Sequence, residues 1–94
     1  MAYVLVHHKI GKWSQFEAIY QNEQARRQAL GSKSGMVFRS VDDPESIFSI
    51  HEWGTIEGAR KFIEGLETHE AMEWASSGIS SDVYIVEKVL DAEA

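Results

Sequence analysis

Apolar residues recur along the chain with two different periods, and these periods predict where strands and helices lie. Short runs rich in β-branched and aromatic residues predict four strands, at residues 2–10, 36–41, 47–53 and 82–89. Apolar residues three or four positions apart predict two longer helices, from Ser14 to near Gly31 and from a Thr55 cap to Leu66. A bend near Gly65 then separates the second helix from a short helical segment at residues 70–75.

Capping and turn residues mark the ends of these elements. Ser14 and Glu17 fit a capping box, in which each side chain accepts from the backbone N–H of the other, so we expect the first helix to begin there. Gly78 suits the left-handed position that ends the short helical segment. Pro44 presets the backbone for a turn at residues 42–45, which predicts a hairpin of the second and third strands.

The order strand, helix, strand, strand, helix, strand predicts a ferredoxin-like βαββαβ fold. This α+β fold has a four-stranded antiparallel sheet with two helices on one face. We expect one domain over residues 1–94, with an acidic tail at 91–94 that frays. Some strands are apolar on both faces, as where Leu5 lies between Val4 and Val6. Since two helices cover only one face, we predict a homodimer in which a second copy covers the other. A monomer with a solvated face is the alternative.

Composition and charge narrow the classes of function. The net charge is −6 and no basic stripe occurs, so we expect no nucleic-acid partner. The absence of cysteine excludes disulfides, thiolate nucleophiles and cysteine-ligated metals. No apolar stretch is long enough for a membrane span and no signal peptide is recognisable, so we expect no membrane association and a soluble, cytoplasmic protein. Neither metal-site spacing nor a glycine-rich nucleotide loop occurs, so we expect no metal or other cofactor.

Three segments together resemble the small dimeric α/β-barrel proteins of the antibiotic-biosynthesis-monooxygenase-like superfamily. The segments are YVLVHHKIGKW, GSKSGMVFRSVDDPESIFSIHEWGTIEGARKF and THEAMEWASSGISSDVYIVEKV, and they span nearly the whole chain. The pattern is most similar to short, functionally undefined members at His8-Lys9, Arg39, Glu52-Trp53 and Ala71-Met72. The resemblance implies a ferredoxin-like protomer, a two-fold dimer whose sheets close into a barrel, and a pocket between each sheet and its helices.

Members of this superfamily have several activities, so the resemblance alone does not choose one. They include cofactor-independent oxygenases acting on polyketide-like phenols, polyketide cyclases, isomerases, haem-degrading enzymes and members with no known activity. The haem-degrading relatives use an asparagine, a tryptophan and a histidine. The only asparagine here, Asn22, lies within the first predicted helix, which argues against haem degradation.

Two adjacent histidines on the first strand are the first candidates for chemistry. Successive strand side chains point to opposite faces, so His7 and His8 cannot both serve one site. His8 matches the superfamily pattern, and we place it toward the pocket as the candidate catalytic acid or base. The alternative is that His8 only bonds a backbone carbonyl near the end of the strand. His51 is most simply a partly buried interface histidine, and His69 a solvated helix residue.

Aromatic residues at helical spacing are the candidate ligand contacts. They are Trp13, Phe16, Tyr20, Phe62, Met72 and Trp74. An ordinary packed core is the alternative for each of them, although three tryptophans are many for 94 residues. Arg39 ends the second strand and suits a carboxylate or phenolate, or else it pairs with an acidic residue of the turn that follows.

Two hypotheses about function follow. In the first, the protein is an enzyme that acts without metal or bound cofactor on a small aromatic or polyketide-like molecule, with His8 as acid or base. In the second, it is a non-catalytic homodimer that binds a hydrophobic metabolite or only dimerises. An open cavity at His8 favours the first hypothesis, and a cavity filled by aromatic side chains favours the second.

Overall fold

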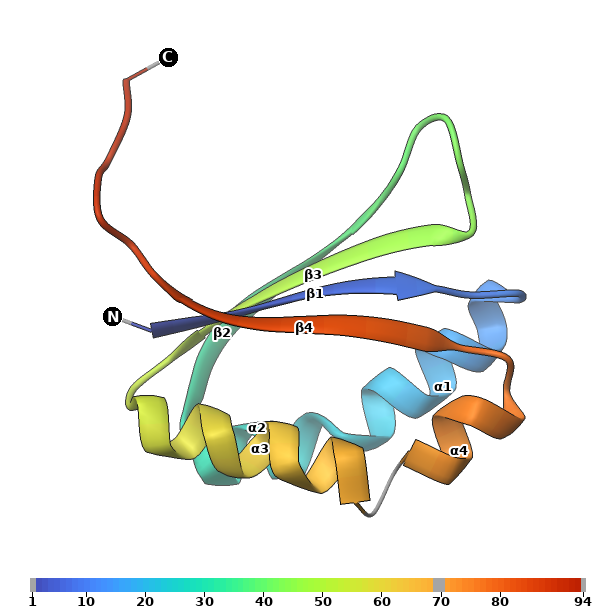
Figure 1. The fold of residues 1–94 in the computed structure, drawn as a ribbon, viewed down its shortest axis with the longest axis horizontal. Helices are drawn as coiled ribbons and strands as arrows, with labels where there is room; N and C mark the ends of the chain where they lie inside the picture. Colours follow the sequence, from blue (N-terminus) through green and yellow to red (C-terminus); the bar gives the residue numbers. More distant parts are fainter. Residues whose placement is uncertain (1, 69–70, 94) are drawn as a thin grey trace.

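The computed structural model describes residues 2–68 and 71–93, which form one sheet with helices on one of its faces (Figure 1). The strands are β1 (Ala2–Lys9), β2 (Ser32–Arg39), β3 (Ser46–Trp53) and β4 (Ser80–Glu87). The helices are α1 (Trp13–Asn22), α2 (Gln24–Leu30), α3 (Ile56–Thr68) and α4 (Ala71–Ser76). The sheet is antiparallel with the order β2-β3-β1-β4. This is the predicted ferredoxin-like α+β fold.

β1 and β3 differ from the predicted strands by one residue at one end, whereas β2 and β4 differ by two or more residues at each end, and their pairing explains why. β2 begins at Ser32 rather than residue 36, because the polar segment after Gly31 already pairs with β3. Its pairing ends at Arg39, so Val41, which we predicted in the strand, is 98% exposed in the turn. β4 spans residues 80–87 rather than 82–89, because each of these residues pairs with β1, and Glu87 pairs with Ala2, the first residue of β1.

The first predicted helix differs in two ways. It begins at Trp13 with Lys12 in the N-cap position and no side-chain capping bond, so the predicted Ser14 capping box is wrong. It also breaks at Glu23, dividing the expected single helix into α1 and α2. The break is stabilised because the Tyr20 carbonyl accepts from the backbone N–H of Glu23 at 3.2 Å and from Nη1 of Arg27 at 3.0 Å. Within the described residues, four helices therefore cover one face of the sheet (Figure 1): α1 and α2 from the divided helix, α3, and α4, which corresponds to the predicted short segment.

Three other predicted helix boundaries are confirmed, at Thr55, Gly31 and Gly78. Thr55 caps α3, because its Oγ1 accepts from the backbone N–H of Gly58 at 3.0 Å. Gly31 and Gly78 end α2 and α4 in the left-handed region, with φ of 111° and 72°. The predicted bend near Gly65 is wrong, because α3 continues through Gly65 and Leu66 to Thr68. Residues 69–70, which follow, lie outside the described residues. No helix in the described part of the chain is long and apolar enough to cross a membrane.

The core lies between the sheet and the helices. It has two adjoining clusters of buried residues. They are Ala2, Val4, Val6, Trp53, Ala59 and Phe62 in one, and Ile10, Phe16, Ile19, Ile47, Trp74 and Ile79 in the other. Even-numbered β1 residues point into this layer, as the alternation from Ala2 to His8 predicts.

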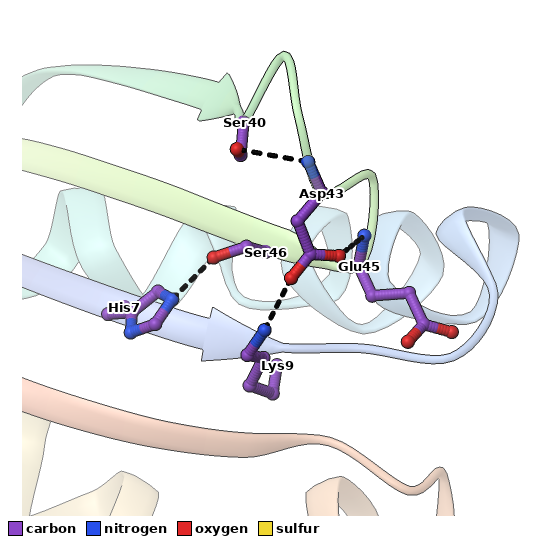
Figure 2. Close-up of polar contacts among 6 residues, drawn as sticks. All are labelled: His7, Lys9, Ser40, Asp43, Glu45 and Ser46. Atoms are coloured by element: carbon purple, nitrogen blue, oxygen red, sulfur yellow. Dashed lines mark hydrogen bonds and ion pairs between the residues drawn. The ribbon is translucent and has the colours of Figure 1, made fainter.

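Asp43 organises the β2–β3 turn and ties it to the end of β1 (Figure 2). Its Oδ1 accepts from the backbone N–H of Glu45 at 3.1 Å, and its own backbone N–H donates to Ser40 Oγ at 3.2 Å. Lys9 Nζ donates to Oδ2 at 2.5 Å, and this bond is the main reason that the pKa of Asp43 is lowered. Lys9, and not Arg39, is therefore the ion-pair partner of the turn.

The opposite face of the sheet carries no helix, and it is apolar. We call it the open face, and its residues come from alternate positions of all four strands. The larger apolar ones are Leu5, Met36, Phe38, Phe48, Tyr84 and Val86, which are 38–60% exposed. The segment after β4 leaves the sheet on this side, away from the helices (Figure 1). The predicted fraying tail begins within this segment, which has no helix or strand through residue 93.

Candidate functional site

His8 lies inside the helix-covered layer, held by a hydroxyl and two aromatic rings. Its Nδ1 is 2.7 Å from Ser81 Oγ on β4, the strand that pairs with β1. The imidazole is stacked on Trp74 at 5.7 Å between ring centroids and meets Phe16 edge-on at 4.9 Å. These contacts fix the orientation of the ring, and the described residues provide no hydrogen-bond partner for Nε2.

Burial sets the protonation state of His8. The pKa of His8 is lowered from 6.5 to about 4, mainly by burial and in smaller part by the nearby His7 and His51, which repel a positive charge. His8 is therefore neutral at pH 7, with one nitrogen as a hydrogen-bond donor and the other as an acceptor.

A cavity of about 340 Å³ opens beside His8. It lies between β4 and the helices α3 and α4, and Trp74, Ile79 and Val83 make much of its wall. Ser81 and Asp82 supply polar groups at the strand, and Glu67 supplies one from α3. The cavity combines apolar walls with a few polar groups, the usual character of a small-molecule site. We call it the His8 cavity.

A second buried histidine lies across the same layer. His51 Nε2 is 2.5 Å from the hydroxyl of Tyr20 on α1, and its Nδ1 is 3.5 Å from Ser32 Oγ. Burial and then the charge of Arg27 lower the pKa of His51 to about 4. Burial raises the pKa of Tyr20, so at neutral pH the tyrosine hydroxyl is protonated and donates to neutral His51.

The space between the two histidines is nearly filled. A void of about 30 Å³ remains, bordered by both imidazoles, Trp53 and Phe62 among others. Trp53 Nε1 has no hydrogen-bond partner within the described residues and is buried. A void of this size holds about one water molecule, which that N–H group would bind. The middle of the layer therefore has no room for a larger molecule, whereas the His8 cavity does.

The predicted ligand residues fall into two groups. Phe16, Phe62 and Trp74 are buried in the layer, and Tyr20 is half-buried beside them. Trp13 is 37% exposed and packs on Phe16 at a ring distance of 5.5 Å, so it supports the layer from outside.

Of the predicted ligand contacts, all within the described residues, only Trp74 lines the His8 cavity, and two of the others lie on the surface. Met72 is 83% exposed because it lies on the solvent side of the short helix α4, while Trp74 takes the inner side. Arg39 is exposed, and its guanidinium lies over the Trp13 ring at 4.8 Å. The structure thus brings neither residue to His8.

Sequence reasoning missed Ser81 and the role of His51. Ser81 meets His8 across 73 residues, and only the β1–β4 register places the two together. His51 lies two residues before Trp53 and so points to the same face of the third strand, and this alternation is the sequence signal that it faces the core. Instead of an interface, it lies in the helix-covered layer. No group of three or more potential metal ligands converges within the described ranges.

The comparisons with known proteins agree with this fold. No protein-family model matches the chain, and no curated protein matches it in sequence. SnoaB, a cofactor-independent oxygenase from Streptomyces nogalater, has a similar structure with a TM-score of 0.78. The two chains are 16% identical over 96% of this chain and 94% of SnoaB. The chain shares the ferredoxin-like fold of SnoaB.

Two further solved structures extend the comparison. An antibiotic biosynthesis monooxygenase has a TM-score of 0.68 at 17% identity and covers 96% of this chain and all of its own. A dimeric ferredoxin-like protein from an uncultured marine organism has a TM-score of 0.67 at 9% identity, covering 97% of both chains. The structural neighbours are thus antibiotic biosynthesis monooxygenase-like proteins, and at these identities the likeness concerns the fold.

Proposed function

We propose that the protein binds a small aromatic or polyketide-like molecule in the His8 cavity and acts on it by proton transfer to His8, without a bound cofactor. The observation that carries this proposal is the setting of His8. Its Nδ1 is bonded to Ser81, its ring is held by Trp74, and it lines an apolar cavity of about 340 Å³. The fold shared with SnoaB, a cofactor-independent oxygenase, supports the same class of chemistry.

The low pKa of His8 favours an acidic substrate. In the empty cavity the imidazole is a weak base, because its burial disfavours the charged form. A phenol that places its oxygen at Nε2 changes this balance, since the phenolate formed by proton transfer stabilises the imidazolium beside it. The electron-rich phenolate is then the species that reacts with dioxygen or cyclises.

A homodimer is the assembly that we propose for this function. The open face has six large apolar side chains that are at least 38% exposed, an unusual surface for a protein in water. Structural neighbours include a protein described as dimeric. Packing of two open faces against each other would bury these side chains by two-fold symmetry.

The second candidate function is a non-catalytic dimer that binds a hydrophobic metabolite or only dimerises. The specific observation in its favour is the middle of the layer, where Trp53, Phe62 and Trp74 leave only about 30 Å³. If the His8 cavity binds a ligand without reaction, this function replaces the first.

The probe for the test is 1-naphthol, with binding followed by tryptophan fluorescence and reaction by oxygen uptake and mass spectrometry. Oxidation of 1-naphthol to a naphthoquinone consumes one dioxygen and releases one water, so it needs no external reductant. We expect wild type and His7→Ala to react and His8→Ala to lose at least about tenfold in rate, since a positioned acid or base contributes about 100-fold or more.

Stability is measured alongside activity, because the hydrogen bond between His8 and Ser81 also contributes to folding. Loss of the bond to Ser81 should cost about 1 to 3 kcal/mol, so Ser81→Ala serves as the matched control for this effect. A reaction that survives in His8→Ala would contradict the proposal. Binding of naphthol with no reaction in wild type would favour the non-catalytic dimer.

A further inference from the structure

A second cavity, of about 240 Å³, lies at the other edge of the sheet. It is formed where α1 and α2 meet the beginning of β2, whereas the His8 cavity lies at β4 on the opposite edge. Tyr20 and His51 form its inner wall, and Gln24 and Gln28 of α2 form its outer wall. We call it the β2-edge cavity.

The β2-edge cavity has a basic lining in an acidic protein. Arg27 and Lys33 line it, and none of its lining residues is Asp or Glu, although the chain carries a net charge of −6. Two acidic groups lie close to the cavity without lining it. Glu23 borders the interior void, and Glu52 accepts a hydrogen bond from Ser34 at 3.4 Å. The cavity is therefore suited to an anion.

Arg27 is held in a fixed orientation at this cavity. Only 6% of the residue is exposed, and its guanidinium lies 4.0 Å from the centroid of the Tyr20 ring. One nitrogen, Nη1, donates to the Tyr20 carbonyl at 3.0 Å, and this leaves the other N–H groups of the planar fork for a ligand. A guanidinium fixed in this way recognises a planar carboxylate with little loss of conformational entropy.

The strand opposite Arg27 is shaped around His51. The β2–β3 register shifts between Ser32 and Ser34, so Lys33 is an extra residue in β2. At Gly35 a side chain would overlap the imidazole of His51, so the glycine allows the ring to lie against the strand. Such irregularities in an edge strand often re-aim side chains next to binding sites.

We propose that the β2-edge cavity is a binding site for a small planar organic carboxylate, recognised by Arg27 with Lys33 and the Tyr20–His51 pair beside it. This site is separate from the His8 cavity and does not depend on the function proposed there. The carboxylate pairs with the guanidinium of Arg27. Tyr20 and His51 already bond each other, and they form the polar wall behind it.

The experiment follows backbone amide shifts by NMR while sodium benzoate is added at constant ionic strength. Benzamide, a neutral molecule of the same shape, is the control for charge, and inorganic phosphate is the control for anion type. We expect benzoate to shift the amides of residues 32–35 and of Arg27, with benzamide and phosphate at least about fivefold weaker. Shifts confined to the His8 cavity, or equal responses to phosphate or benzamide, would overturn the proposal.

A pair of matched substitutions tests the position of the site. Gln24→Glu adds one carboxylate at the wall of the cavity, and Gln15→Glu adds one on the exposed side of α1 outside it. Both lie in the first turn of a helix, where an acidic residue is favourable, so both variants should fold. We expect Gln24→Glu to weaken benzoate binding about two- to fivefold and Gln15→Glu to leave it unchanged. Equal affinities in the two variants would contradict the site.

Arg27→Gln gives the larger effect and is measured after its folding is checked by circular dichroism. We expect it to weaken benzoate binding at least about tenfold, because it removes the charge and the planar fork. Retention of wild-type affinity in a folded Arg27→Gln variant would refute the assignment. If the variant does not fold, the pair at Gln24 and Gln15 still decides the question.

Discussion

The two faces of the sheet carry similar numbers of apolar side chains but differ in what lies against them. On β1, Val4 and Val6 are 2% and 5% exposed beneath the helices, whereas Leu5 between them is 38% exposed on the open face. The helix-covered face also holds the polar groups with the most perturbed protonation, His8 and His51. Burial thus creates the candidate chemistry on one face, and its absence leaves an exposed apolar surface on the other, the proposed dimer interface.

The largest effect should come from a charge placed on each face in turn. Val6→Asp would bury an unpaired carboxylate in the core, which costs several kcal/mol and should prevent folding of a domain with a total stability of about 5–15 kcal/mol. Leu5→Asp should fold as a monomer, since its carboxylate reaches water once the dimer separates.

Circular dichroism and light scattering at micromolar concentration distinguish these outcomes. The wild type is expected at twice the chain mass and Leu5→Asp at the chain mass, with similar spectra. A wild type that is already a monomer, or a Leu5→Asp variant that remains a dimer, would show that the open face is not the interface.

The next largest effect should be a loss of stability at acidic pH, caused by the two buried histidines of the helix-covered face. His8 and His51 have a pKa of about 4 in the folded protein, below the value of 6.5 for an exposed imidazole. The unfolded chain therefore binds more protons between pH 6.5 and 4, and the free energy of unfolding should fall as the pH falls through this window. At pH 4, each histidine should have lowered the free energy of unfolding by roughly 3 kcal/mol relative to neutral pH. Above pH 7 the two histidines should have no further effect on stability.

Urea unfolding at several pH values between 4 and 8 measures this slope. His51→Gln removes one titrating group while keeping an acceptor for the Tyr20 hydroxyl, so it should reduce the slope by about half. A stability that does not change between pH 6.5 and 4.5 would mean that the two histidines are not buried as neutral groups.

A smaller effect should come from one methyl group on the helix-covered side of the β2 edge. Gly35→Ala forces the His51 ring to move, and we expect it to destabilise the fold by about 1–3 kcal/mol. Gly11→Ala is the control, because no atom lies within 4 Å of the added carbon. Thermal melting of the two variants checks this, and equal melting temperatures would show that the ring has room to move.

The features predicted correctly from sequence are those that depend on the local backbone geometry of a strand or a helix end. Alternation along β1 correctly placed His8 and His7 on opposite faces, because the side-chain period of a strand is fixed at two. Gly31 and Gly78 were correct as helix ends, because the left-handed region suits glycine. The Ser14 capping box was wrong, because α1 begins one residue earlier, at Trp13, whose ring packs on Phe16.

Much of the candidate site could not be predicted in this way. Met72 and Trp74 are two residues apart on a six-residue helix, and which of them faces inward depends on how α4 docks. Likewise, Arg39 was expected at the ligand, but the nearest partner for its guanidinium is the exposed ring of Trp13. Spacing alone carries no information about such contacts between elements.

The sequence by itself determined the order of the elements, the antiparallel α+β fold and the apolar character of both faces of the sheet, because these depend on periodicity and on glycine and turn residues. Only the tertiary structure decided which groups meet. The pairing of β1 with β4 brings Ser81 to His8 across 73 residues, and the docking of α1 brings Tyr20 to His51 across 31. Because burial arises only from this packing, the lowered pKa of each histidine is likewise a property of the fold and not of the residue.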